Sequence, residues 1–310
     1  MTASATAPAV RRPGLPPLLS AMRPYQWPKN GLIFAAFIFS AGDAWKPSDP
    51  GSWWPLLWRS GALFALWSLV SSAMYLLNDI EDRELDRIHP RKRHRAIARG
   101  ALTPRAATTT AVCLGAVALP LAFVLDTRAG AVLAGYTVIM LAYSGGLKRV
   151  PILDVLILSA GVVARAVGGA LAIDVSISPW LYVCSSFAAF FFASSKRWAE
   201  HRQLGPEAAQ HRPALAQYGS EILGQLLTIS AASALLSYAL YTIESRHVPR
   251  NGSMALTLPW VAFALFRYLL LLDGPRRGDA PDRILFTDPQ ILVAVAGFVA
   301  TAVTVLLWNH

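Results

Sequence analysis

The chain has 310 residues, of which 55% are hydrophobic and only 15% are charged. A soluble domain of this size could not bury so much apolar surface, so the composition excludes a soluble globular protein and indicates a polytopic, all-α membrane protein. The net charge of +10 is typical of nucleic-acid-binding proteins too, but the basic residues lie between apolar segments and form no nucleic-acid-binding motif, so we expect no nucleic-acid partner.

Nine apolar segments, each near the roughly 20 residues that a helix needs to cross a bilayer, predict a bundle of nine transmembrane helices. They lie at about 30–45, 55–78, 105–125, 129–147, 152–174, 179–197, 222–243, 254–273 and 288–308. Residues 1–20 are rich in Ala and Pro and predict a disordered cytoplasmic tail, so residues 21–310 form a single transmembrane domain. Most Lys and Arg residues fall in this tail and in the loops on its side, which by the positive-inside rule is the cytoplasmic side.

The end of the second span carries five acidic residues in eight positions, from Asp79 to Asp86. Read as a continuous helix, Asn78, Asp82 and Asp86 are spaced at i, i+4 and i+8, and Asp79 joins them on one face. Such hard oxygen ligands suit Mg²⁺, which binds one or two carboxylates together with phosphate oxygens of a substrate. We therefore expect Asn78 and Asp82 to hold Mg²⁺ and Asn78, Asp82 and Asp86 to be catalytic. The alternative is an acidic helix end that forms salt bridges with a basic loop.

A dense basic run follows the acidic cluster and provides the positive charge that a phosphate-rich substrate requires. It contains Arg91, Lys92, Arg93 and Arg95. Lys29, which precedes the first span beside Asn30, is also predicted to contact phosphate. Tyr75, one helical turn before Asn78, is expected to hydrogen-bond the substrate.

A second group of candidate residues lies near the turn after the fourth span and near the end of the sixth. They are Tyr143, Lys148, Asp154, Arg165, Lys196 and Arg197. Asp154 and Arg165 are eleven residues, or three helical turns, apart and share one face, which suggests an intramembrane ion pair that is either functional or structural. Lys196 and Arg197 are either phosphate ligands or ordinary positive-inside flanks.

These features resemble the UbiA superfamily of intramembrane prenyltransferases over roughly residues 20–305. The resemblance is carried by the Asn-Asp-x-x-Asp-x-x-x-Asp motif at 78–86 and the Tyr-x-x-x-Leu-Lys turn at 143–148. Typical members have a second aspartate-rich motif after the sixth helix, where a second Mg²⁺ binds a prenyl diphosphate. Here the corresponding segment, 194–200, contains Lys196 and Arg197 instead. This departure argues against a standard quinone or haem prenyltransferase.

Within the superfamily, four segments resemble the actinobacterial branch of decaprenyl-phosphate phosphoribosyltransferases: 23–30, 78–95, 143–154 and 195–197. The resemblance implies phosphoribosyl diphosphate as donor, a polyprenyl phosphate such as decaprenyl phosphate as acceptor, a role in forming the arabinose donor of the cell wall, and a homotrimer. The loops that carry the candidate residues lie on the cytoplasmic side, so we expect a plasma-membrane (inner-membrane) enzyme in contact with membrane lipid, with its active site on that side.

As a hypothesis, we divide the cationic and polar candidates between the two substrates. Exchanging the roles of Lys92 and Lys148 would fit the sequence equally well. Donor binding is assigned to Lys29, Tyr75, Asp79, Arg91, Lys92, Arg93 and Arg95, and binding of the lipid phosphate to Tyr143, Lys148, Asp154, Arg165, Lys196 and Arg197. Two alternatives remain open: a prenyltransferase that joins a prenyl diphosphate to an aromatic or haem acceptor, and a transporter or lipid-binding scaffold.

Overall fold

The computed structural model describes residues 15–42, 44–89, 92–176, 178–204, 217–245, 248–274, 284–285 and 287–308. The regular secondary structure in these ranges is helical, which confirms the all-α prediction. Residues 1–14 of the predicted tail lie outside the described residues.

The described residues include eleven α-helices and four 3₁₀ segments. The α-helices are α1 (Pro17–Met22), α2 (Ala35–Phe39), α3 (Pro50–Glu81), α4 (Arg83–Ile88), α5 (Pro104–Leu125), α6 (Thr127–Gly145), α7 (Leu153–Ala172), α8 (Pro179–Leu204), α10 (Ser220–Glu244), α11 (Leu258–Asp273) and α13 (Pro289–Trp308). The 3₁₀ segments are η1 (Pro24–Phe34), η2 (Lys92–His94), η3 (Leu147–Arg149) and η6 (Ser253–Thr257).

Eight of the nine predicted spans each coincide with one long α-helix, namely α3, α5, α6, α7, α8, α10, α11 and α13. Six helical segments of the described chain are long and apolar enough to cross a membrane: α3, α5, α7, α10, α13 and the continuous run of η6 and α11. The protein is therefore a multi-pass membrane protein, as predicted, although the count of nine helices is not confirmed.

The first predicted span, 30–45, is not a continuous α-helix. It consists of η1, which contains Pro28, followed by the five-residue α2. Proline lacks the backbone N–H that an α-helix needs and clashes with the preceding turn, so the chain adopts the tighter 3₁₀ form here. Hydrogen bonds from Trp27 to Ser72 Oγ (3.0 Å) and from Asn30 to Ser68 Oγ (3.0 Å) fasten η1 to α3.

The predicted disordered tail also ends too late, because α1 occupies its last four residues. Pro17 stands at the first turn of α1, where its missing N–H has no cost. Ala21 is buried, and Leu18 and Met22 pack against the main core. This apolar contact explains why the chain is already ordered before residue 21.

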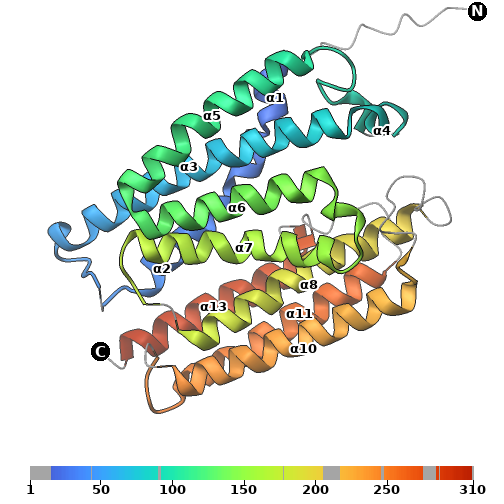
Figure 1. Cartoon of the computed structure of the whole chain (residues 1–310). Helices are drawn as coiled ribbons and strands as arrows, with labels where there is room; N and C mark the ends of the chain where they lie inside the picture. Colours follow the sequence, from blue (N-terminus) through green and yellow to red (C-terminus); the bar gives the residue numbers. More distant parts are fainter. Residues whose placement is uncertain are drawn as a thin grey trace, which may run out of the picture.

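The long helices lie side by side, with α7 between the half formed by α3, α5 and α6 and the half formed by α8, α10, α11 and α13 (Figure 1). The segment η1 packs on both α3 and α7. At Gly169 of α7 an added Cβ would overlap the carbonyl group of Ile33, so this close crossing requires glycine. We call the end of the bundle where α3, α6 and α8 finish and α7 begins the site end.

Candidate functional site

The acidic motif at the site end is divided by a break in the helix. Helix α3 ends at Glu81, Asp82 adopts a turn conformation (φ −83°, ψ 2°), and α4 starts at Arg83. The prediction that Asn78, Asp79, Asp82 and Asp86 line one face of a continuous helix is therefore wrong. Like charges one turn apart repel in a regular helix, and the break lets the carboxylates reach different cations.

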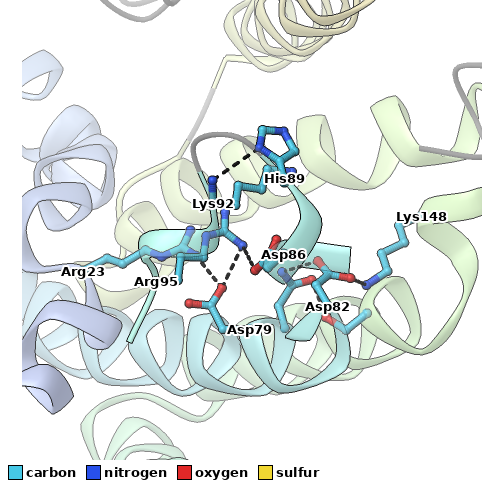
Figure 2. A network of polar contacts seen from close by, with 10 residues as sticks. Arg23, Asp79, Asp82, Asp86, His89, Lys92, Arg95 and Lys148 are labelled. Carbon is cyan, nitrogen blue, oxygen red and sulfur yellow. Dashed lines mark hydrogen bonds and ion pairs between the residues drawn. The ribbon is translucent and has the colours of Figure 1, made fainter. Parts of the chain in front are cut away.

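Asp79 and Asp86 are both 2% exposed and share Arg95, and Asp79 also pairs with Arg23. The Arg95 guanidinium donates to Asp86 (2.7 Å) and to Asp79 Oδ1 (3.1 Å), and Arg23 donates to the same Asp79 oxygen (Figure 2). Arg23 also stacks on the Tyr75 ring, 4.9 Å from its centroid. Two buried carboxylates and two guanidinium groups thus neutralise one another. Asp79 and Asp86 thus follow the alternative stated above, in which the acidic helix end forms salt bridges with the basic loop, here through Arg95.

Asp82 points away from this cluster and toward the end of α6 (Figure 2). One of its oxygens accepts a hydrogen bond from Lys148 Nζ (2.5 Å), and the other accepts from the Asn78 amide (3.0 Å). The Asp82 side chain is 22% exposed, so it is the accessible carboxylate of the motif. The structure therefore brings together Asn78, Asp82 and Lys148, which we call the Asp82 corner.

The Asp82 corner fits a Mg²⁺ ion that takes few protein ligands. The described residues contain no group of three or more His, Cys, Asp or Glu side chains that could hold a metal ion. Mg²⁺ commonly binds one or two carboxylates and completes its octahedron with water and substrate phosphate. The Asn78 oxygen now accepts from Ser144 Oγ (3.5 Å), so the amide must turn over to offer it to the ion.

The predicted ion pair between Asp154 and Arg165 is wrong. Residues eleven apart on one helix share a face but are separated by about 16 Å along its axis, which is too far for contact. Asp154 instead pairs with Arg197 of α8 (Nε to Oδ2, 2.6 Å). Arg165, farther along α7, donates to Asn30 Oδ1 (2.7 Å) and to the Tyr136 hydroxyl (3.2 Å).

Arg197 is buried, 4% exposed, and its guanidinium is already engaged. Besides Asp154 it contacts Glu200 (2.8 Å) and the Tyr143 hydroxyl (3.5 Å). The Tyr218 hydroxyl donates to the other oxygen of Asp154 (2.8 Å). This network joins α7, α8 and the residues before α10, so its geometry favours a structural role for Arg197 and Asp154 over binding of a lipid phosphate.

Tyr218 also fixes the start of α7, because its hydroxyl accepts a hydrogen bond from the Ile152 N–H. Ile152 has a positive φ of 67°, which a β-branched residue rarely adopts without strong support from its surroundings. Burial and the adjacent Asp154 carboxylate raise the pKa of Tyr218 to about 12, so it stays a neutral donor at physiological pH.

The remaining predicted residues are distributed around the site end. Lys29 and Arg93 are exposed, Tyr75, Lys92 and Lys196 are partly buried, and Arg91 lies outside the described residues. The backbone N–H of Lys92 donates to His89 (3.3 Å; Figure 2). Sequence reasoning missed Arg23, Asn30, Tyr136, Glu200 and Tyr218. Arg23 begins segment 23–30, one of the segments that carry the resemblance. Its partner Asp79 is 56 residues away, so the sequence alone did not reveal the pair.

Comparisons with known proteins identify the family and the fold. Residues 34–288 match the model of the UbiA prenyltransferase family. The chain is 31% identical over 284 residues to the decaprenyl-phosphate phosphoribosyltransferase of Mycobacterium tuberculosis, covering 92% of each chain. It is also 31% identical over 295 residues to that of Corynebacterium glutamicum, covering 91% of this chain and 84% of the relative. The solved structure of a UbiA homologue from Archaeoglobus fulgidus bound to GPP and Mg²⁺ superimposes with a TM-score of 0.69 at 18% identity, covering 93% of this chain and 99% of that one.

Proposed function

Because the chain belongs to the UbiA prenyltransferase family, we propose that it is a membrane-embedded transferase that moves the 5-phosphoribosyl group from phosphoribosyl diphosphate to a polyprenyl phosphate. The similarity to decaprenyl-phosphate phosphoribosyltransferases over nearly the whole chain supports this choice of substrates. It also supports decaprenyl phosphate as the acceptor and a role in the arabinan precursors of the cell wall.

The observation that carries the proposal is the contact between Asp82 and Lys148 (2.5 Å). It places an accessible carboxylate, which can hold a divalent cation, directly beside a lysine, which can hold a phosphate. Transfer from a diphosphate requires both, because the leaving pyrophosphate accumulates negative charge as it departs. A Mg²⁺ ion held by Asn78 and Asp82 would neutralise part of that charge.

The reaction exchanges one carbon–oxygen bond for another. The bond from ribose C1 to the pyrophosphate oxygen breaks, and an oxygen of the lipid phosphate forms the new bond from the opposite face, with inversion. Lys29, Lys92 and Arg93 hold the departing pyrophosphate, while Lys148 and Lys196 position the attacking lipid phosphate. A phosphate monoester is already ionised at neutral pH, so the site needs no general base.

The buried arginine pairs have supporting roles in this proposal. Asp79 and Asp86 hold Arg23 and Arg95, and through them they fix the segment from Asp82 to the basic run. We therefore assign Asp86 a positioning role instead of the catalytic one expected from its spacing. Arg197 and Asp154 join α8, which carries Lys196, to the start of α7, and η3 with Lys148 directly precedes that start.

We further propose that the protein lies in the plasma (inner) membrane with the site end toward the cytoplasm. The excess of Lys and Arg in the loops at this end supports that orientation. Phosphoribosyl diphosphate is a soluble, highly charged molecule, so it reaches a site that opens to the aqueous phase. A homotrimer is part of the proposal on the basis of resemblance alone.

The test is direct transfer by the purified protein in detergent. Labelled phosphoribosyl diphosphate, decaprenyl phosphate and Mg²⁺ should yield a labelled lipid, and a chelator should stop the reaction. Asp82→Asn should lower turnover by at least about a hundredfold, the scale seen when a charge-stabilising group is removed, with an unchanged unfolding temperature.

The matched control is Glu84→Gln, which changes an exposed acid two residues away whose partner is Arg87. It should retain wild-type turnover. Product formation from a prenyl diphosphate and an aromatic acid, with none from phosphoribosyl diphosphate, would contradict the proposal and identify an ordinary prenyltransferase. Movement of lipid or solute across vesicles without any transfer would identify a transporter.

A further inference from the structure

Arg165 lies inside the bundle on α7 with neutral partners. Its Nε donates to Asn30 Oδ1 (2.7 Å), one terminal nitrogen donates to the Tyr136 hydroxyl (3.2 Å), and the other to the carbonyl of Gly161. Among the residues that the structure describes, no carboxylate forms an ion pair with it. A cation inside a membrane bundle is costly unless an anion compensates it, so an arginine in this position indicates a binding site for an anion.

Two aromatic rings complete the surroundings of this guanidinium. Its carbon lies 5.0 Å from the centroid of Tyr136 and 5.8 Å from that of Trp67. Trp67 is fully buried, and its indole N–H has no hydrogen-bond partner in the described part of the chain. The Ser71 hydroxyl, one turn away, is buried without a partner as well. Buried polar groups are normally paired, so these two donors remain for an acceptor that reaches them when neighbouring side chains move aside.

A polar face of α3 connects this region with the Asp82 corner. Trp67, Ser71, Tyr75 and Asn78 occupy positions i, i+4, i+8 and i+11, which fall on one side of a helix. Tyr75 lies between the two ends of this face. A ligand lying along it would meet cations at both ends and a tyrosine in the middle.

We propose that Arg165, Tyr136 and the Trp67 indole form an internal subsite for a phosphate monoester, occupied in the reaction by the 5-phosphate of the ribosyl donor. The inference rests on the proposed function for the identity of this occupant. The donor carries phosphate at both ends of its ribose, so its diphosphate lies at the Asp82 corner while its 5-phosphate reaches Arg165. Arg165 thereby selects a 5-phosphorylated donor, a role different from the lipid-phosphate contact expected from the sequence.

The position of the subsite favours the donor over the lipid. Four elements contribute its groups: η1 (Asn30), α3 (Trp67), α6 (Tyr136) and α7 (Arg165). The segment η1 packs on α3 and α7, and α6 packs on the same two helices. A polyprenyl chain attached to a phosphate at this point would have to pass through that packed interior, whereas the ribose of the donor is compact and polar. The lipid phosphate is better met by Lys148 and Lys196 at the site end.

The first test measures binding without catalysis. Calorimetric titration should detect ribose 5-phosphate binding to the wild-type protein without Mg²⁺, and Arg165→Gln should weaken it about 30-fold, equivalent to about 2 kcal/mol. Asp82→Asn should leave this affinity within about twofold. The matched control Arg59→Gln removes another partly buried arginine, one that donates to the Leu125 carbonyl at the opposite end of α3. It should bind ribose 5-phosphate as the wild type does, and equal binding by Arg165→Gln would overturn the subsite.

The second test compares phosphoribosyl diphosphate with ribosyl diphosphate lacking the 5-phosphate. The wild type should prefer the first by kcat/KM, and Arg165→Gln should lose that preference, with Arg165→Lys restoring part of it. Tyr136→Phe, which removes only a hydroxyl, should reduce the preference in a folded protein. An equal loss for both donors, or a KM increase confined to decaprenyl phosphate, would overturn the assignment. If the wild type transfers nothing but binds ribose 5-phosphate through Arg165, the subsite stands and the proposed function falls.

Discussion

Replacing Asp154 by alanine should destabilise the protein strongly without touching the Asp82 corner. Asp154 is fully buried and Arg197 is 4% exposed, with 2.6 Å between Oδ2 and Nε. Removing one member of a buried pair leaves the other charge uncompensated, which typically costs about 3–5 kcal/mol. Glu200 stays in contact with Arg197 at 2.8 Å, so we expect the lower end, about 3 kcal/mol.

Thermal unfolding in detergent, followed by tryptophan fluorescence, measures the effect. Asp154→Ala should unfold at a clearly lower temperature, and the double variant Asp154→Leu with Arg197→Met should recover much of the loss, because an apolar pair of similar volume removes both charges. The matched control is Asp174→Asn, which removes the charge from an exposed pair with Arg128 (2.8 Å), keeps a residue type that tolerates the positive φ of 56° at this position, and should change little. An Asp154→Ala protein with wild-type unfolding but a raised KM for decaprenyl phosphate would refute the structural role.

Three further predictions concern other parts of the structure. Asp86→Asn should leave the Mg²⁺ concentration for half-maximal activity unchanged while lowering the unfolding temperature, because Asp86 holds Arg95; a raised Mg²⁺ requirement would make it a metal ligand. Gly169→Ala should destabilise by about 1–3 kcal/mol through overlap with the η1 backbone, whereas Gly135→Ala, with open space around it, should be neutral or stabilising in the same unfolding assay. The pKa of Tyr218 rises from 10.0 to about 12, so its contribution to stability is complete below pH 10 and lost as pH rises through about 12. Tyr218→Phe should therefore lower the unfolding temperature equally at about pH 7 and about pH 9, and a difference between the two would contradict this.

The membrane-spanning helices were predictable because the bilayer requires long apolar runs with internally paired backbones. The exceptions have local causes. Pro28 turns the first predicted span into a 3₁₀ segment, and the charge density between Asp79 and Asp86 favours a break at Asp82. Periodicity alone could not show that break, because it assigns every residue of a segment to one continuous helix.

The partners of the charged residues could not be predicted because they come from distant parts of the chain. Asp82 meets Lys148 across 66 residues, and Arg165 meets Asn30 across 135. Lys196 and Arg197 read alike in the sequence, yet successive residues on a helix point about 100° apart, following from 3.6 residues per turn. The packing of α8 against α7 and α10 decides which of the two points inward, and that packing is a property of the whole bundle.

Asp79 receives one arginine from the chain before α3 and another from the chain after α4. A single carboxylate therefore holds the segment before α3 and the basic run at the same point. A fusion partner or tag that displaces residues 15–22 would also displace Arg23 and so disturb its ion pair with Asp79 in the acidic motif. A fusion at the C-terminal end, beyond α13, would be attached to the other half of the bundle and should leave the ion pair between Arg23 and Asp79 unchanged.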